Sequence, residues 1–144
     1  IQLCGIDVEF DKKIEAHSDG DVAIHALIDA LLGSIGEGDI GEHFPPSDPK
    51  WENFSSSEML KTVNHLLTKT GAEIINIDLT IICERPKILK LKGSMKESLA
   101  NVLNISKSRI NVKATTTEKL GFLGRQEGIA AESVVSVKIR LLDE

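Results

Sequence analysis

The sequence predicts an α/β domain: a two-layer sandwich in which a mixed sheet of four to five strands carries helices on one face. Two observations support this class. Segments with the period-two hydrophobicity of strands alternate along the chain with segments of helical spacing. The chain also has 144 residues, of which 41% are hydrophobic, which is enough for one hydrophobic core. We therefore expect residues 1–144 to form a single domain.

A hairpin and a helix are predicted at the N-terminus. Residues 1–8 are apolar and are interrupted by Gly5, which favours a hairpin or an edge strand. In residues 21–35 the apolar positions recur at helical spacing, and glycines end the pattern. Ser18 or Asp19 is the expected N-cap, because both side chains can accept a hydrogen bond from the first turn.

The middle of the chain predicts a long loop, a helix and a strand. Residues 37–53 are rich in glycine, proline and aspartate, and such long loops in small domains are usually functional. Residues 57–70 place their apolar side chains on one stripe, which indicates an amphipathic helix. Residues 73–84 alternate with period two. The inward-facing set expected for this strand is Ile75, Ile77, Leu79, Ile81 and Cys83.

The C-terminal part adds a third helix and two strands. The helix is expected from residue 88 or 94 to residue 103, and a short strand at 110–114. A second polar loop at 115–128 precedes a long alternating strand at 129–142. The outer face of this last strand carries Ala, Val and long charged side chains. We therefore expect the uncovered sheet face to pack against another copy of the chain.

Composition and charge argue against nucleic acids and membranes as partners. The formal net charge is −5, and both kinds of surface attract a positive field. Aromatic residues make up 3% of the chain, with no tyrosine, so recognition of bases by stacking is not expected. No apolar run approaches the roughly 18 residues of a membrane span. Cys4 and Cys83 lie far apart in apolar segments, which is typical of buried thiols.

The stretch from residue 16 to residue 29 is the richest in candidate chemistry. Its helix start in Ser-Asp-Gly predicts free backbone N–H groups at the positive end of a helix dipole, which suits a phosphate. Asp21, His25 and Asp29 are four residues apart and share one helix face, where they could hold a metal ion. A capped helix with a solvated polar stripe explains the same residues equally well.

Two further segments offer polar groups for a phosphorylated ligand. Asp39 lies between glycines and could accept hydrogen bonds from a diol, although an ordinary turn explains it nearly as well. Residues 115–117 are three threonines followed by Glu118 and Lys119. They could supply hydroxyls, a carboxylate for a hard cation and a positive charge. The alternative is a strand end followed by a solvated charge pair.

Four blocks together resemble the 2-C-methyl-D-erythritol 2,4-cyclodiphosphate synthase family of the non-mevalonate isoprenoid pathway. They are residues 16–25, 29–33, 38–45 and 111–122. The resemblance implies an α/β sandwich assembled as a homotrimer, with active sites between subunits. It also implies a lyase reaction in which the 2-phosphate of 4-diphosphocytidyl-2-C-methyl-D-erythritol 2-phosphate attacks the β-phosphorus and releases CMP. Attack of one anion on another requires charge neutralisation and positioning.

The resemblance also implies a metal for two residues. His25 resembles one of three zinc ligands, and Asp29, one turn later, would orient its imidazole. Glu118 resembles the carboxylate that holds Mg²⁺ or Mn²⁺. The residues with an implied catalytic role are His17, Ser18, Thr116 and Glu118.

The remaining residues carried over by resemblance bind the substrate. Those implied to contact the methylerythritol hydroxyls are Asp39 and Gly41, with Asp48 as a possible substitute where Pro46 departs from the family pattern. Those implied to line the cytosine pocket are Cys83, Pro86, Lys87, Ile88, Leu89 and Ala114. Those implied to reach other parts of the substrate are Thr115, Thr117, Phe122 and Arg125.

One departure concerns the segment before Ile1. The family's other two zinc ligands form an Asp-x-His pair upstream of the first strand, so we expect that pair in an N-terminal segment missing from this sequence. A bacterial cytoplasmic location is expected, or a plastid if a transit peptide precedes the chain. Two other functions compete with the synthase: a non-catalytic trimeric module that binds cytidine nucleotide or isoprenoid phosphate, and a zinc hydrolase with open-chain products.

Overall fold

A mixed sheet with helices on one side organises the computed structural model, which describes residues 1–16 and 18–140. The strands are β1 (Gln2–Leu3), β2 (Ile6–Asp7), β3 (Ala72–Ile82), β4 (Ile110–Thr115) and β5 (Ala130–Ile139). The α-helices are α1 (Val22–Ser34), α2 (Ile40–His43), α3 (Ser56–Lys69), α4 (Lys92–Leu103) and α5 (Gly121–Gly124). Short 3-10 helices are η1 (Pro49–Trp51), η2 (Leu89–Leu91) and η3 (Lys107–Arg109).

The strands form two sheets rather than the single sheet of four to five strands that the sequence predicted. In the described part of the chain, the larger sheet has the order β4-β3-β5, with β3 parallel to β4 and antiparallel to β5. Strands β1 and β2 pair only with each other, as the predicted hairpin. Each has two residues, and their turn is hydrogen-bonded to the start of α1. The hairpin is thus held by a helix.

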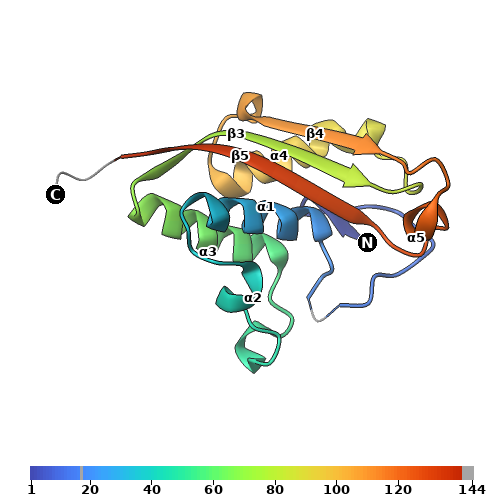
Figure 1. Cartoon of the computed structure of the whole chain (residues 1–144), viewed down its shortest axis with the longest axis horizontal. Helices are drawn as coiled ribbons and strands as arrows, with labels where there is room; N and C mark the ends of the chain where they lie inside the picture. Colours follow the sequence, from blue (N-terminus) through green and yellow to red (C-terminus); the bar gives the residue numbers. More distant parts are fainter. Residues whose placement is uncertain (17, 141–144) are drawn as a thin grey trace.

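Helices cover one face of the larger sheet, as predicted. Helix α1 lies along β5, with α3 beside it, and α4 packs behind β4 (Figure 1). The side chains of Ile77, Leu79 and Ile81 point into this interface and are fully buried. Removing such residues from water is the main stabilising contribution to a fold of this kind.

The period-two pattern of β3 is interrupted, so part of the prediction for this strand was wrong. Ile75 was expected to face inward, but it is 41% exposed and Ile74 is buried instead. The pairing of β3 with β5 shifts register between Ile74 and Asn76. A bulge of this kind inserts one residue and reverses the faces on either side of it.

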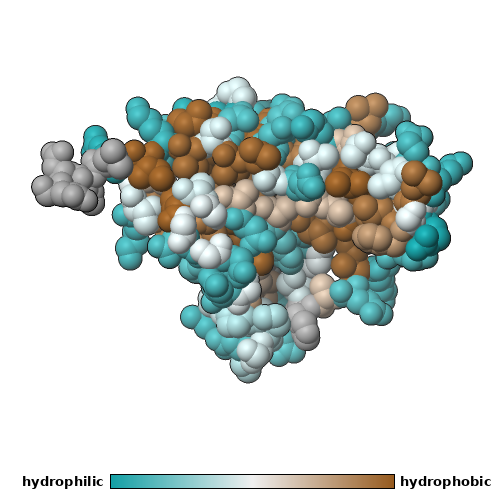
Figure 2. Space-filling view, in the orientation of Figure 1, coloured by the Kyte–Doolittle hydropathy of each residue, from teal (hydrophilic) through white to brown (hydrophobic). Residues whose placement is uncertain are grey.

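The opposite sheet face has no helix over it in the described residues. This face carries an ion pair between β4 and β3, with Lys113 Nζ and Asp78 Oδ2 2.8 Å apart. Val134 on β5 is 71% exposed on the same face, since it pairs with Asp78. Figure 2 shows hydrophobic side chains gathered over the strands. Packing of this face in a homotrimer stays a prediction.

The long loop predicted at 37–53 contains two short helices, α2 and η1. Asp39 and Asp48 begin them, each by accepting a hydrogen bond from a backbone N–H two or three residues later. No helix in the described part of the chain is long and apolar enough to cross a membrane.

Candidate active site

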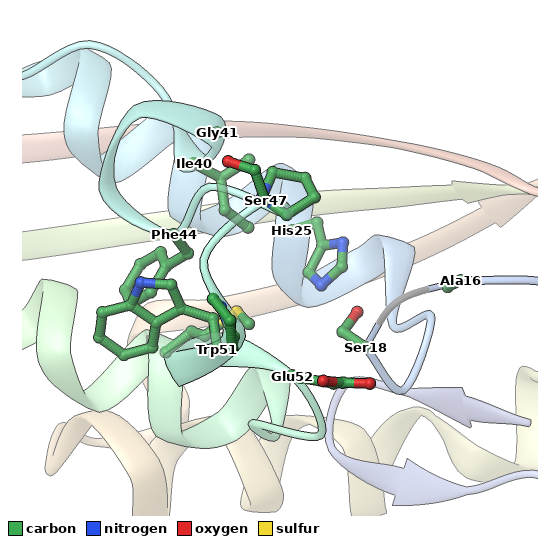
Figure 3. A pocket seen from close by; sticks show the side chains of 12 residues that line it. Ala16, Ser18, His25, Ile40, Gly41, Phe44, Ser47, Trp51 and Glu52 are labelled. Atoms are coloured by element: carbon green, nitrogen blue, oxygen red, sulfur yellow. The ribbon is translucent and has the colours of Figure 1, made fainter.

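A cavity of about 480 Å³ lies between the start of α1 and the segment that carries α2 and η1 (Figure 3). Its polar lining comes from Ser18, His25, Ser47 and Glu52. Its apolar lining includes Ile40, Phe44, Pro46, Trp51 and Met59. Phe44 and Trp51 meet edge to face with ring centroids 4.8 Å apart. The cavity therefore has an aromatic wall opposite a small polar group of side chains.

His25 lies on α1 and is half-buried at this cavity. Its Nε2 lies 2.8 Å from Ser56 Oγ. Ser56 is fully buried at the start of α3, where its hydroxyl donates to Asp19 and its backbone N–H donates to the other carboxylate oxygen of Asp19 at 3.0 Å. The sequence analysis missed Ser56. Its only signal was a serine pair at a helix start, which predicts a cap but no contact with residue 25.

Asp29 has a different contact from the one that the resemblance implied. Its carboxylate accepts a hydrogen bond from the backbone N–H of Ile40 at 2.8 Å, and the bond recorded for the His25 ring is to Ser56. Asp29 therefore ties α1 to the start of α2. The bonded residue, Ile40, and the next residue, Gly41, both line the cavity.

The expected N-cap of α1 was wrong, whereas phosphate binding near this helix start stays a prediction. Asp21 is the N-cap; its Oδ1 accepts from the N–H groups of Ile24 and Cys4, both at 3.0 Å, and its Oδ2 accepts from Gly5 at 2.7 Å. Asp21 is fully buried, so it shares no solvated stripe with His25. Within α1, the carboxylate satisfies the N–H of Ile24.

Burial raises the pKa of the Asp21 carboxyl above its ordinary value of 3.8, and the neighbouring Asp19 carboxylate acts in the same direction. The three backbone N–H groups that it accepts from oppose this shift, because they stabilise the charged form. The carboxylate is thus retained in the interior at a cost in solvation, in exchange for three hydrogen bonds.

The residues expected to bind the methylerythritol hydroxyls lie around α2 and η1. Asp39 is exposed and caps α2 by accepting from the N–H of Glu42 at 3.0 Å. Asp48 caps η1 by accepting from the N–H of Lys50 at 3.0 Å. Gly41 and Pro46 line the cavity. Ser18, expected at the phosphate, also lines it, and Figure 3 shows its hydroxyl pointing toward the ring of His25. His17 lies outside the described residues.

A second cavity, of about 210 Å³, gathers the residues expected at the cytosine. Its lining includes Cys83, Pro86, Lys87, Ile88, Leu89, Ala114, Thr115 and Thr116, together with Lys92. Strands β3 and β4 end side by side here, and the N–H of Cys83 donates to Thr115 O at 3.0 Å. Burial raises the pKa of the Cys83 thiol. The sequence analysis missed Lys92, which the spacing of the third helix could not place at a pocket.

Glu84 holds the loop that follows β4. Its two carboxylate oxygens accept from the N–H groups of Thr117 at 3.0 Å and Lys119 at 3.3 Å. Glu118, between them, has a φ of 53° and Lys119 one of 65°, both in the left-handed region that residues with a Cβ rarely adopt. The sequence analysis missed Glu84. Glu118 is exposed, and Glu84 holds the backbone N–H groups of the residues on either side of it.

Phe122 lies on α5 and Arg125 directly follows it, and neither is among the residues that line the first or the second cavity. Phe122 is 55% exposed. Arg125 pairs with Glu127, with Nε and Oε1 2.8 Å apart, and this bond lowers the pKa of the Glu127 carboxyl. The structure therefore places both residues on the surface of the single chain.

Among the described residues, no group of three or more His, Cys, Asp or Glu side chains is arranged to hold a metal ion. His25 and Glu118 each stand as a single candidate ligand. Zinc in proteins takes three or four ligands, so the described residues alone do not fit a complete zinc site.

Comparison with known proteins gives a consistent result. The model of the YgbB family matches residues 1–138. The chain is 55% identical over 135 residues to 2-C-methyl-D-erythritol 2,4-cyclodiphosphate synthase of Anaplasma marginale, which covers 94% of this chain and 73% of that protein. It is 52% identical to a bifunctional enzyme IspD/IspF of Caulobacter vibrioides, across 96% of this chain and 36% of the relative.

A solved structure agrees with the sequence relatives. IspF of Plasmodium falciparum, described as a CDP complex, superposes with a TM-score of 0.84 at 32% identity and covers 96% of this chain and 83% of that one. The chain spans only about a third of the length of the bifunctional relatives. The family model nevertheless covers almost all of the described residues, so the chain belongs to the YgbB family.

Proposed function

We propose that this chain is a cyclodiphosphate synthase, a lyase that converts 4-diphosphocytidyl-2-C-methyl-D-erythritol 2-phosphate to 2-C-methyl-D-erythritol 2,4-cyclodiphosphate and CMP. The observation that carries the proposal is the second cavity. Its lining unites the ends of β3 and β4 with residues 86–89, which are the positions that the resemblance assigned to the cytidine. A relative with the same fold is described as a CDP complex.

The cavity at the strand ends suits a cytidine diphosphate. Lys87 and Lys92 bring positive charge to it, which offsets part of the diphosphate charge. Thr115 and Thr116 add hydroxyls at the same edge. Backbone groups of residues 83–89 would read the base, because most side chains there are apolar. The protein's contribution to such a reaction is positioning and charge neutralisation, since the nucleophile belongs to the substrate.

The first cavity would hold the methylerythritol phosphate. Ser18 and His25 face one another there, and Gly41 contributes backbone groups from α2. Its aromatic wall, formed by Phe44 and Trp51, would exclude water from the apolar side of the substrate. Asp39 and Asp48 order this segment by capping its short helices, and their carboxylates would accept hydrogen bonds from the sugar hydroxyls.

Members of this family are generally metal-dependent. We propose that His25 supplies one zinc ligand, with an Asp-x-His pair preceding Ile1 completing the set, and that Glu118 holds Mg²⁺ or Mn²⁺. Such cations, when bound, neutralise phosphate charge as Lewis acids. The described residues do not complete the zinc site.

The two cavities share no lining residue, and this favours an active site composed of two subunits. In a homotrimer packed through the exposed sheet face, the first cavity of one protomer would meet the second cavity of its neighbour. The exposed Val134 on β5 and the Asp78–Lys113 pair would then be buried at the common axis. Arg125 and Phe122 on the surface would be free to reach a neighbouring site. Each protomer contributes one domain, residues 1–144.

The experiment measures CMP release by the intact protein from the diphosphocytidyl substrate with Mg²⁺ and Zn²⁺, in parallel with calorimetric titration of CDP. The proposal expects both turnover and binding. His25→Ala should abolish CMP release while leaving CDP affinity within about twofold, because the two residue sets lie in different cavities. CDP binding without CMP release would instead identify a non-catalytic binding module and overturn the proposal.

A further inference from the structure

A chain of three polar side chains runs from a surface turn to the imidazole at the first cavity. Asp19 belongs to the turn before α1, Ser56 to the first turn of α3, and His25 to α1. Ser56 Oγ donates to Asp19 Oδ1, and Oγ lies 2.8 Å from His25 Nε2. The hydrogen bonds therefore connect a carboxylate to a hydroxyl and the hydroxyl to an imidazole, and Ser56, which provides the hydroxyl, is fully buried.

The hydroxyl of Ser56 has one proton to give, and its geometry shows where that proton goes. The Asp19 carboxylate is an acceptor only, so in the hydrogen bond between the two side chains Ser56 is the donor. Ser56 Oγ must then act as an acceptor toward His25, and the donor is the N–H on Nε2. In a neutral imidazole, a proton on Nε2 leaves Nδ1 without one.

Asp19 cannot easily turn away from this arrangement. Its Oδ2 also accepts from the backbone N–H of Ser56 at 3.0 Å, and its Oδ1 accepts from the N–H of Asp21 at 3.2 Å. The carboxylate is thus fixed by two backbone groups from different elements. A buried hydroxyl that lost this partner would be left with an unsatisfied proton, which is costly in an interior.

We infer that Asp19 and Ser56 hold His25 in the tautomer with its proton on Nε2, which leaves Nδ1 as the ring nitrogen that can accept a proton or a hydrogen bond from a ligand in the first cavity. This inference deepens the proposed function, on which it rests, by specifying how the His25 ring is oriented and protonated. Asp19 and Ser56 are positioning residues. A hydrogen bond to one ring nitrogen of a histidine generally decides which nitrogen remains free to bind.

The test is a two-bond ¹H–¹⁵N correlation spectrum of the intact, ¹⁵N-histidine-labelled protein at a pH where the ring is neutral. We expect a protonated, pyrrole-type Nε2 and an unprotonated, pyridine-type Nδ1 for His25. A proton on Nδ1, or equal populations of both tautomers, would overturn the inference.

Two variants and a control link the tautomer to the chain of side chains. Ser56→Ala should lower the ratio of the Nε2–H to the Nδ1–H form about fivefold, the effect of one ordinary hydrogen bond. Asp19→Asn should lower it as well while keeping the shape of the turn. Ser55→Ala removes the neighbouring N-cap of α3 without touching His25, so its ratio should stay unchanged. An unchanged ratio in both Ser56→Ala and Asp19→Asn would refute the inference.

CMP release measured on the same samples separates this inference from the proposed function. A protein with the Nε2–H tautomer and no CMP release would contradict the synthase proposal and leave the tautomer assignment standing. CMP release by a protein with the proton on Nδ1 would support the synthase proposal and overturn the tautomer assignment. In Ser56→Ala, kcat should fall more than KM changes, because the substrate still finds both cavities while His25 is oriented for less of the time.

Discussion

Removing the Asp21 carboxylate should destabilise the fold far more than removing any exposed helix cap. In Asp21→Ala, three backbone N–H groups lose their acceptor: those of Cys4, Gly5 and Ile24, at 3.0, 2.7 and 3.0 Å. Each buried donor left unpaired costs about 1–3 kcal/mol, and part of this sum is returned because a buried carboxylate is itself costly. We expect a net loss of about 3–5 kcal/mol in the free energy of unfolding.

Urea unfolding followed by circular dichroism at fixed protein concentration measures this loss. With an m-value of about 2 kcal/mol/M, the midpoint should fall by about 2 M. Ser55→Ala is the matched control, because it removes a single bond at the more accessible N-cap of α3 and should cost about 1 kcal/mol. If Asp21→Ala cost no more than Ser55→Ala, the carboxylate would not be what joins the hairpin to α1.

The pH dependence of the same variant supplies a signed check. Because burial raises the pKa of Asp21 above 3.8, the folded protein holds this proton more strongly than the unfolded chain does. Stability contributed by this group therefore falls as pH rises through the window between the unfolded pKa and the raised folded pKa. The advantage of the wild type over Asp21→Asn should grow as pH is lowered toward 4. An advantage that shrinks there would contradict the assignment of the shift to burial.

Three further outcomes follow from the two cavities. Lys87→Ala should weaken CDP binding in calorimetry about threefold to tenfold, the effect of one partly exposed charge on a phosphate, whereas Lys61→Ala on α3 should leave it unchanged. Cys83 should react with a thiol reagent more slowly than free cysteine at pH 8, because burial raises the pKa of its thiol. Bound CDP should slow the reaction further, and the same rate with and without CDP would contradict CDP binding in the second cavity. Glu84→Ala should raise the Mg²⁺ concentration needed for half-maximal CMP release, since the backbone around Glu118 loses two hydrogen bonds, and an unchanged Mg²⁺ requirement would refute its role.

Local periodicity was sufficient to predict most elements of this fold. The helices α1, α3 and α4 and the strands β3, β4 and β5 lie within a few residues of their expected bounds, because each carries a regular stripe of aliphatic side chains. The interruption of β3 at Ile75 was not predictable in this way. A bulge depends on how β5 pairs across it, and the run of isoleucines in β3 fits either face.

The candidate site was predictable where chain neighbours form it and not where distant segments meet. The second cavity uses two contiguous stretches at the ends of adjacent strands, and the family resemblance of these stretches named nearly all of its lining. Ser56 and Glu84 contact residues 31 and 33 positions away, which no spacing rule indicates. Asp21 looked like part of a polar helix face, but its carboxylate turns inward to the hairpin, where it accepts from the N–H groups of Cys4 and Gly5.

The central claim, that this chain closes a cyclic diphosphate, is tested most directly by phosphorus NMR of the reaction products of the intact protein. We predict CMP and a single cyclic diphosphate in equal amounts, with no phosphomonoester other than CMP. Open-chain phosphate products would identify a hydrolase. Substrate that remains intact beside a protein that binds CDP would show that the two cavities do not form a catalytic site.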